Sequence, residues 1–476
     1  MPDELASIWV PYDVDVWIIP HVFSVLGFLL AVFLLSRILR EHRPPASTMA
    51  WLLAIVLVPY VGVPLYFLIG GRKHRRLAAR KAPLYPRTRS AGVGSEAQHA
   101  VERVLVTSGA TRPTSGNGLA LLPDGEAAYK YITELFEHAE RSIDVSTFIL
   151  GNDDTGSAVL EILTRKAGEG VRVRLLLDGL FAFRTSRRAL HRFTRAGGKL
   201  AVFMPLLRLP FRGPANLRNH RKIIVVDGKC GVLGGMNLAS EYMGPTPLPG
   251  RWRDLSLALS GPAVVHLHAV FRSDWEFAAS SADSGNADAL EFSPEPRGTA
   301  RLQVVASGPD VLLDTYYDAM LAALFQARQR IWIATPYFIP DESITRALLL
   351  AIRRGVDVRL VVPARSNHLT ADIAGGSYLR QIEQIGGKVC PYLPSMMHGK
   401  MTLIDGDIGV IGSANLDMRS LFLDYEIAVF VYSPDEIDQL SQWFQSLLVD
   451  CASELPRPGR TRALAEDLGR LLAPLM

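Results

Sequence analysis

Two segments of the chain place histidine, lysine, aspartate and asparagine at one shared spacing. They run His220-x-Lys222-x4-Asp227-x6-Gly234-Gly235-x-Asn237 and His398-x-Lys400-x4-Asp405-x6-Gly412-Ser413-x-Asn415. A neutral imidazole can attack phosphorus or move a proton, and ammonium and amide groups can hold the oxygens of an anion. The two segments together therefore predict chemistry on a phosphodiester, in which one histidine bonds to phosphorus and the other protonates the leaving oxygen.

The residues that follow each histidine predict a strand, a turn and a returning strand. Side chains two residues apart lie on the same face of a strand, so each histidine shares a face with the lysine after it. The aspartate lies an odd number of residues further on, at the strand end, and is expected to brace the fold rather than to contact substrate. The returning strands, Cys230–Gly234 and Ile408–Gly412, then bring Asn237 and Asn415 back towards the histidines.

A catalytic imidazole usually needs a carboxylate that orients its second ring nitrogen. Glu426 follows His398 by 28 residues and begins the apolar run Glu426–Val431, whereas Asp254 follows His220 by 34 residues, beside the apolar run 255–259. We predict that these two carboxylates are the orienting groups. The alternative is that they merely end a strand.

The sequence does not predict a metal site or a cofactor. Histidine, lysine and asparagine form a poor metal cage, and the three cysteines, Cys230, Cys390 and Cys451, lack the paired spacing of a structural zinc site. The nine histidines outside the two motifs are expected to be structural or exposed.

Three pairs of matched segments occur in the same order along the chain. Each pair has the same pattern: a helix end with a strand, a strand after a helix, or the motif itself. The pairs are 134–149 with 323–339, 170–178 with 355–363, and 219–237 with 397–415. A repeat of this kind predicts an α/β fold of two duplicated lobes, with one active site shared at their interface.

The N-terminal part contains two long stretches without a charged residue. Val16–Ser36 has 21 residues and Pro44–Gly71 has 28, and each is long enough to cross a bilayer as a helix. Pro59, Gly62 and Pro64 interrupt the second stretch, which predicts a kinked or partly re-entrant segment. We therefore expect a helical transmembrane hairpin. A cleavable signal peptide is the alternative, but the acidic start of the chain disfavours it.

The charge distribution points to a membrane rather than to a nucleic acid. The formal net charge is +4; residues 36–81 carry nine Lys or Arg and one acid, and residues 82–476 carry 42 of each sign. The basic segment after the second stretch favours cytoplasmic lobes and attraction to anionic lipids. Residues 165–222, with fifteen basic and two acidic residues, are expected to attract anionic headgroups or to form a solvated basic face.

The paired motifs resemble those of the phospholipase D superfamily over about residues 120–450. The hairpin, the run Asn219-His220-Arg221-Lys222, and Gly261-Pro262-Ala263-Val264 followed by Phe271 and Asp274-Trp275 are similar to bacterial cardiolipin synthases. The resemblance implies two phospholipase D-like lobes and transfer of a phosphatidyl group between two phosphatidylglycerol molecules, with release of glycerol. It also implies a phosphohistidine intermediate and no metal.

The same resemblance assigns the site residues. The implied catalytic His, Lys and Asn are His220, Lys222, Asn237, His398, Lys400 and Asn415, and we count the motif aspartates, Asp227 and Asp405, in the same catalytic set. The resemblance makes His220 the nucleophile and His398 the acid and base. Ser240 departs from the acidic residue common at that position, which leaves the contacts on the glycerol side open.

We expect five parts in the chain. They are a transmembrane hairpin with a basic segment at 1–81, a connector with one short helix at 82–119, a first lobe at 120–278, a linker at 279–299, and a second lobe with a C-terminal helix at 300–476. The expected location is the bacterial inner membrane, with phosphatidylglycerol and cardiolipin as lipid partners and a homo-oligomer left open.

Three other functions remain to be weighed. Hydrolysis, or transfer with a different donor or acceptor, stays open because pocket shape and water exclusion select the acceptor. A nuclease of the same superfamily is disfavoured by the balanced charge of residues 82–476. A catalytically inactive lipid-binding scaffold is disfavoured because binding alone needs no paired imidazoles.

Overall fold

The computed structural model describes residues 45–69, 81–85, 99–205, 217–279 and 295–472, together with single positions between Val22 and Ser36. The chain divides into an N-terminal unit, residues 1–72, and a large unit from residue 73 onward. Of the expected linker, residues 280–294 lie outside the described residues, as does most of the first uncharged stretch.

The N-terminal unit contains the helices α2 (Pro45–Leu57) and α3 (Pro59–Ile69). Proline has no backbone N–H and restricts the residue before it, which explains why α2 ends just ahead of Pro59. The chain then turns back closely, because a Cβ on Gly62 would lie 2.2 Å from the carbonyl oxygen of Ala54. In the described part of the chain, no helix has both the length and the apolar run required to cross a membrane.

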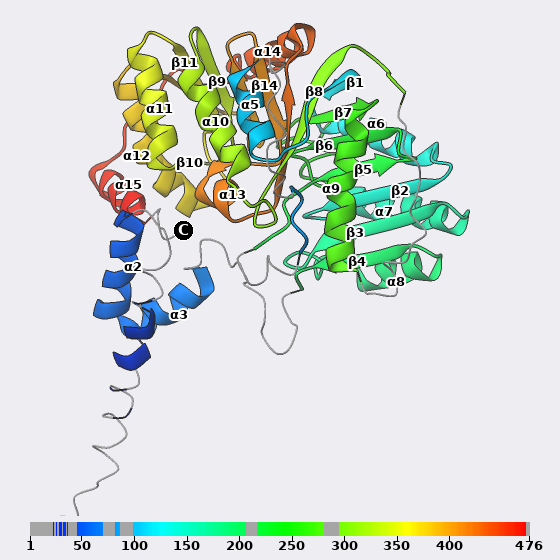
Figure 1. Ribbon diagram of the computed structural model, residues 1–476, viewed down its shortest axis with the longest axis horizontal. Helices are drawn as coiled ribbons and strands as arrows, with labels where there is room; N and C mark the ends of the chain where they lie inside the picture. Colours follow the sequence, from blue (N-terminus) through cyan, green and yellow to red (C-terminus); the bar gives the residue numbers. More distant parts are fainter. Residues whose placement is uncertain are drawn as a thin grey trace, which may run out of the picture. The chain divides into compact units, whose positions relative to one another are not determined.

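The large unit is built on a continuous 14-stranded sheet (Figure 1). The strands of its first half are β1 (Thr114–Leu122), β2 (Ser142–Thr147), β3 (Arg172–Asp178), β4 (Lys199–Phe203), β5 (Ile223–Val226), β6 (Cys230–Gly234) and β7 (Ser256–Ser260). Those of the second half are β8 (Ala300–Ser307), β9 (Arg330–Ala334), β11 (Asp357–Pro363), β12 (Lys388–Tyr392), β13 (Met401–Ile404), β14 (Ile408–Gly412) and β16 (Glu426–Val431).

The two halves repeat one strand order. Read outward from the centre, the first half runs β1-β7-β6-β5-β2-β3-β4 and the second runs β8-β16-β14-β13-β9-β11-β12. The halves join where β1 pairs antiparallel with β8. In each half the three outermost strands are parallel and the others antiparallel. This repeat agrees with the predicted duplication of an α/β lobe.

Helices cover both faces of the sheet. They are α5 (Ala100–Thr107), α6 (Gly125–Glu137), α7 (Asp154–Gly168), α8 (Arg187–Arg195), α9 (Ala263–Ala278), α10 (Thr315–Gln326), α11 (Glu342–Arg353), α12 (Leu369–Gln384), α13 (Met418–Phe422), α14 (Pro434–Leu448) and α15 (Arg460–Leu472). In Figure 1, α9 crosses in front of the first half. Strand β5 has apolar side chains on both faces, so both faces of the sheet need a cover. Ile223 and Val225 join the core under α9, and Ile224 and Val226 join the core under α6 and α7.

Several expected elements are present, and one boundary differs. The predicted strands at 170–178 and 355–363 are β3 and β11, and the expected C-terminal helix is α15. Strand β1, however, begins at Thr114, inside the stretch expected to be a connector. Its small residues, Ser115, Gly116 and Gly118, resemble a loop in sequence, but pairing with β7 and β8 makes them part of the sheet.

Four charged side chains are buried together where the two halves meet. Lys81 Nζ lies 2.8 Å from Asp274 and 2.5 Å from Asp310, and Arg221 lies 2.7 Å from Asp274 and 2.9 Å from Asp310. Arg221 also donates to the carbonyl oxygen of Glu426 at 3.0 Å. Two cations and two anions thus balance inside the protein, and they join four segments of the chain.

Removing one member of this cluster should cost much stability. We expect Lys81→Met to lower the free energy of unfolding by about 3–5 kcal/mol, because an excess negative charge then stays buried on Asp274 and Asp310. Urea unfolding in detergent, followed by circular dichroism, measures this.

The matched control is Arg272→Ala, which removes an ion pair with Glu276 whose side chains are 53% and 59% exposed. This change should cost less than about 1 kcal/mol. Equal losses in the two variants would show that the buried cluster does not hold the halves together.

Candidate active site

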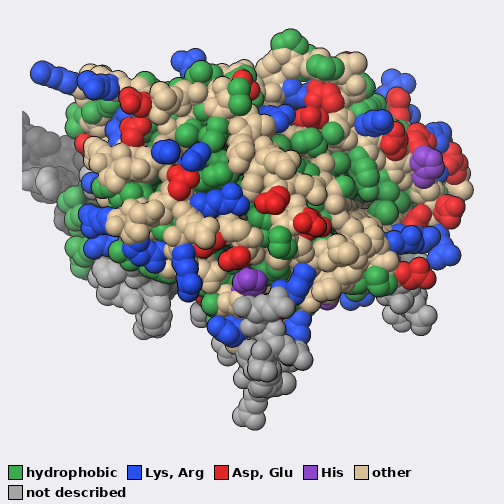
Figure 2. All heavy atoms as spheres, turned by 90° about the horizontal axis from the view of Figure 1, so that it is seen from above, with side chains coloured by type: hydrophobic (Ala, Val, Ile, Leu, Met, Phe, Trp, Pro, Cys, Tyr) green, Lys and Arg blue, Asp and Glu red, His purple; other side chains and the backbone are tan. Residues whose placement is uncertain are grey.

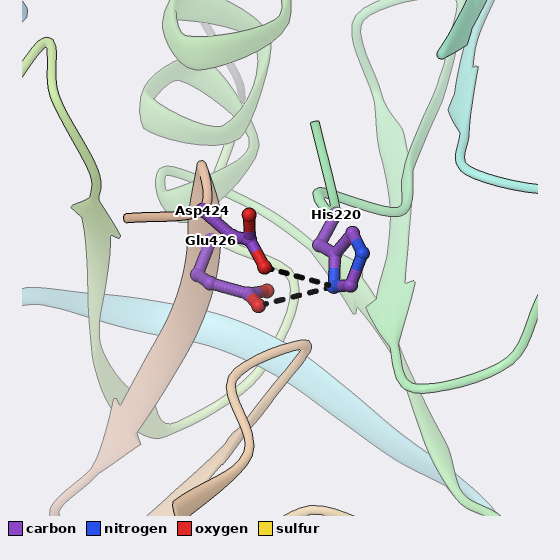
Figure 3. A group of neighbouring side chains, drawn as sticks. All are labelled: His220, Asp424 and Glu426. Carbon is purple, nitrogen blue, oxygen red and sulfur yellow. Dashed lines mark ion pairs between the residues drawn. The ribbon is translucent and has the colours of Figure 1, made fainter. Parts of the chain in front are cut away.

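Each motif histidine meets a carboxylate from the other half of the sheet. His398 Nδ1 lies 2.6 Å from Asp254 Oδ2. His220 Nδ1 lies 3.4 Å from Glu426 Oε1 and 3.9 Å from Asp424 Oδ2 (Figure 3). Asp254 and Glu426 therefore contact the two imidazoles, but in crossed pairs: neither carboxylate orients the histidine that precedes it in its own lobe.

Backbone contacts between the lobes explain the crossing. The His220 N–H donates to the carbonyl oxygen of Tyr425 at 2.9 Å, and the His398 N–H donates to that of Arg253 at 2.7 Å. The residue after each acceptor carries the carboxylate, Glu426 or Asp254. Each backbone hydrogen bond therefore places that carboxylate beside the histidine of the other lobe. Residue spacing within one lobe cannot reveal a pairing that depends on such distant segments.

The surroundings keep both imidazoles neutral at neutral pH. Burial lowers the pKa of His220 to about 3 and the pKa of His398 to about 4. The positive charge of Lys222 contributes to the lowering at His220, and that of Lys400 contributes at His398. A neutral imidazole has a free lone pair, which is the form required for nucleophilic attack.

Both motif lysines lie beside their own histidines. Lys222 Nζ donates to the carbonyl oxygen of His220 at 2.8 Å. Lys400 Nζ lies 2.7 Å from Nδ1 and 3.1 Å from Nε2 of His398. Burial lowers the pKa of Lys400 to about 7 and also lowers that of Lys222. The site therefore contains two ammonium groups that an added anion would stabilise.

Burial also shifts the pKa values of the two acidic residues beside His220. Burial raises the pKa of Glu426 to about 7 and raises that of Asp424 as well. The Ser413 hydroxyl donates to Glu426 Oε2, while Oε1 has no hydrogen-bond partner among the described residues and faces His220. Asp424 is also paired with Arg419 at 3.2 Å.

Ligand atoms of His220, Asp424 and Glu426 all lie within 4.8 Å of one another, so in the described part of the chain this group could hold a divalent cation. The two carboxylates would also stabilise a protonated His220, whose Nδ1 lies near both of them. Lys222 lies close enough to lower the pKa of His220, and its positive charge opposes a cation in this place.

The two motif asparagines lie three residues after the returning strands β6 and β14. Asn237 Oδ1 accepts a hydrogen bond from the backbone N–H of Ile149 at 3.1 Å. Asn415 Nδ2 donates to Asp417 at 3.0 Å, and its Oδ1 is buried without a hydrogen-bond partner within the described ranges. The amide of Asn415 therefore keeps bonding capacity for a bound group.

The carboxylates of the motif aspartates, Asp227 and Asp405, accept hydrogen bonds from the backbone. The Asp227 carboxylate accepts hydrogen bonds from the backbone N–H groups of residues 140–142, and that of Asp405 accepts from residues 328–330. Both residues have a left-handed backbone, with φ of 53° and 52°. The oxygens of each carboxylate accept hydrogen bonds from the backbone of a neighbouring turn. This agrees with the bracing role expected from the strand register.

The difference between Gly235 and Ser413 has a steric cause. A Cβ on Gly235 would lie 2.3 Å from Asp254 Oδ1, so the glycine makes room for the carboxylate that contacts His398. In the second half, Ser413 instead donates a hydrogen bond to the longer Glu426. The two half-sites thus use different pairs of residues to position one carboxylate each.

Sequence reasoning missed the side chains that surround the imidazoles. The Phe148 ring lies 4.0 Å from that of His220, and the rings of Tyr242 and Trp252 lie 5.2 Å and 5.1 Å from that of His398. A weak signal existed for Trp252 and for Asp424, since each lies two residues before a predicted orienting carboxylate. Because one of these residues is aromatic and the other acidic, the sequence did not identify them as equivalent positions of the two repeats.

Two family models match this chain. A family model described as "Cardiolipin synthase, PLD-like domain" matches residues 132–275 and 320–448, and one described as "Phospholipase_D-nuclease N-terminal" matches residues 29–71.

Two relatives match nearly the whole chain. The cardiolipin synthase of Geobacillus kaustophilus is 33% identical over 477 residues, which covers 96% of this chain and 94% of that protein. Cardiolipin synthase 2 of Bacillus anthracis is 32% identical over 470 residues, which covers 95% and 91%.

A solved structure supports the fold. The phosphatidylserine synthase of Haemophilus influenzae superposes with a TM-score of 0.58 at 14% identity, over 75% of this chain and 94% of that one. This likeness confirms the two-lobed α/β architecture. The full-length relatives and the matched domain model lead to one conclusion: the chain belongs to the cardiolipin synthase family of the phospholipase D superfamily.

Proposed function

We propose that this cardiolipin synthase transfers a phosphatidyl group from one phosphatidylglycerol to another through a phosphohistidine on His220. The observation that carries the proposal is the crossed pairing of His220 with Glu426 and of His398 with Asp254. It gathers two imidazoles and their carboxylates at the junction of the halves. Each histidine then has Nδ1 beside a carboxylate and Nε2 as the atom for chemistry; at His398 this second nitrogen also lies 3.1 Å from Lys400 Nζ.

In the first half-reaction, His220 Nε2 attacks phosphorus as its Nδ1–H points to Glu426. A nitrogen–phosphorus bond forms, the bond from phosphorus to the headgroup glycerol oxygen breaks, and His398 gives that oxygen a proton. The bound phosphodiester raises the pKa of His398 through its negative charge, which allows the imidazole to carry that proton.

In the second half-reaction, His398 takes a proton from a hydroxyl group of the second phosphatidylglycerol. The hydroxyl oxygen attacks phosphorus, the bond to His220 breaks, and cardiolipin leaves. Asp254 stabilises the positive charge on His398 at this stage, since it lies 2.6 Å from Nδ1. The histidine is then protonated again, ready for the next turnover.

The remaining motif residues bind the charge that develops on phosphorus. Lys222 and Lys400 are the ammonium groups of the two half-sites, and Asn237 and Asn415 add amide donors. Together they would hold the non-bridging oxygens without a metal ion. The buried lysines favour this role, because an anion restores the protonated form that burial disfavours.

We further propose that residues 1–81 anchor the enzyme in the bacterial inner membrane, with the lobes on the cytoplasmic side. The N-terminal family model at residues 29–71 supports this, as do the uncharged stretches and the basic residues that follow them. A lipid rather than a nucleic acid is the substrate that the charge balance of residues 82–476 favours, and acidic side chains are interspersed with basic ones over much of the face shown in Figure 2.

The reaction can be tested with a single lipid. Purified enzyme given only phosphatidylglycerol, with a chelator present, should release glycerol and cardiolipin in equal amounts. Thin-layer chromatography and an enzymatic glycerol assay measure the two products. Phosphatidic acid as the only lipid product would identify a hydrolase, and loss of turnover with the chelator would reveal a metal requirement.

The two histidines should both be required. His220→Ala and His398→Ala are each expected to lower kcat by about 10³-fold or more, since one removes the nucleophile and the other the acid and base. His191→Ala, at an exposed histidine on α8, should keep wild-type activity. Mass spectrometry after acid-free quenching should find the phosphatidyl adduct on His220. An adduct on His398 would reverse the assigned roles.

Lys400 should set the alkaline limb of the pH profile. Because its pKa lies at about 7 rather than 10.5, its positive charge is lost as pH rises through about 7 in the free enzyme. We therefore expect kcat/KM to fall above this pH. Lys400→Arg keeps the charge, and should move the limb upward by more than about one pH unit even though kcat falls.

The control for this experiment is Lys229→Arg, at an exposed lysine in the β5–β6 turn. Its pH profile should match that of the wild type. A Lys400→Arg profile with an unchanged alkaline limb would show that another group controls it.

A further inference from the structure

A cavity of about 290 Å³ lies in the second half of the large unit, next to the carboxyl ends of β11 and β12. Its walls come from α12, from the residues after β9, from 452–456 and from α15. Most of the lining is apolar: Pro336, Phe338, Val362, Leu379, Leu393 and Leu455 contribute to it. Apolar walls of this size favour an apolar occupant, since hydrophobic burial scales with the area removed from water.

The inner wall of the cavity is built on the same strands as the candidate active site. Phe338, in β10 (Phe338–Ile339), pairs with Leu416 in β15 (Leu416–Asp417). Leu416 follows Asn415 directly, and its N–H donates to the Thr335 hydroxyl at 3.2 Å. Asn415 is therefore adjacent in sequence to the strand pair β10–β15, which forms this wall of the cavity.

The charged groups around the cavity balance one another. Two acids, Asp372 and Glu454, and two bases, Arg380 and Arg462, line it. The arginines are both already paired with Glu466, at 2.6 Å and 2.9 Å. The lining therefore offers no excess positive charge to a phosphate or another anion, and its chemistry fits a hydrocarbon chain.

Exposed apolar side chains accompany the cavity. Leu393, in its lining, is 62% exposed. On α15, whose Arg462 also lines the cavity, Leu464 and Leu468 are 63% and 51% exposed, while the acidic Glu466 points inward to Arg380. Leu464 and Leu468 thus stand among exposed charged residues of this helix, such as Arg462, Asp467 and Arg470. Exposed leucines beside an apolar cavity fit a partner with a hydrocarbon part.

We propose that this cavity binds one acyl chain of the phospholipid whose phosphate is held between His220 and His398, and that it sets the preference of the enzyme for acyl-chain length. The proposal rests on the proposed function for the identity of that phospholipid. It extends the function, because it assigns residues of α12, α15 and 452–456 to substrate binding although they belong to neither motif.

The test compares dihexanoyl and dioleoyl phosphatidylglycerol in mixed micelles, with glycerol release as the readout. Ala371→Trp fills the cavity with a bulky ring, and should lower kcat/KM for the long-chain lipid by about tenfold or more. The value for the short-chain lipid should stay within about twofold. Equal losses for both lipids would overturn the proposal.

A matched pair of surface variants guards against misfolding. Leu393→Ala removes an exposed leucine from the cavity, and Leu350→Ala removes one, 44% exposed, from α11 outside it. Only Leu393→Ala should reduce the preference for the long chain, by about threefold or more. The same chain-length preference in both variants and the wild type would contradict the assignment.

A second readout uses wild-type enzyme and does not depend on the product. Phosphatidylglycerol with a photoreactive acyl chain should crosslink to residues around Leu379 and Leu455. Crosslinks found only outside the cavity would overturn the proposal. Glycerol release without cardiolipin would instead reject the synthase reaction, while chain-length preference and crosslinking would still decide whether the cavity binds the chain.

Discussion

The chemistry of this protein depends on one constraint: each imidazole needs a carboxylate that only the other half of the sheet can supply. His220 meets Glu426 and His398 meets Asp254, so neither lobe holds a complete half-site alone. Arg221 reinforces this at one point, since it follows His220 directly and its guanidinium holds the carbonyl oxygen of Glu426. The buried cluster around Arg221 therefore fixes both members of one pair, and the 14-stranded sheet provides the rigid frame for them.

Burial has opposite effects on the groups of the site, and these effects are linked. The same exclusion of water leaves the imidazoles neutral, lowers the pKa of Lys400 and raises that of Glu426. An empty site is thus poorly suited to carry charge. A phosphodiester changes this balance, because its negative charge favours protonated lysines and a protonated imidazole. Substrate binding and the correct protonation of the site are in this sense one event.

Much of this arrangement could be predicted from residues, and the limits were geometric. The period of two predicted that each histidine shares a strand face with its lysine; the lysines do lie beside their histidines, but β5 and β13 begin only at Ile223 and Met401. The same period predicted a bracing role for Asp227 and Asp405, which agrees with their hydrogen bonds to 140–142 and 328–330. The pairing of the carboxylates could not be predicted, because it depends on contacts between loops far apart in the chain. The Phe148 and Trp252 rings were missed because their types differ between the repeats. Of the hairpin expected at the N-terminus, the second uncharged stretch is described as α2 and α3, and most of the first lies outside the described residues.

The reciprocal arrangement of the half-sites bears on how such a chain can arise and change. A single lobe with this design is complete only beside a second copy related by a two-fold axis. In such a dimer the carboxylate of each copy contacts the histidine of the other. Fusion of two copies into one polypeptide removes the need for them to be identical. Gly235 with Asp254 in one half, and Ser413 with Glu426 in the other, are two such diverged solutions. Asymmetry of this kind permits a division of labour, because two fused halves can specialise where two identical subunits cannot.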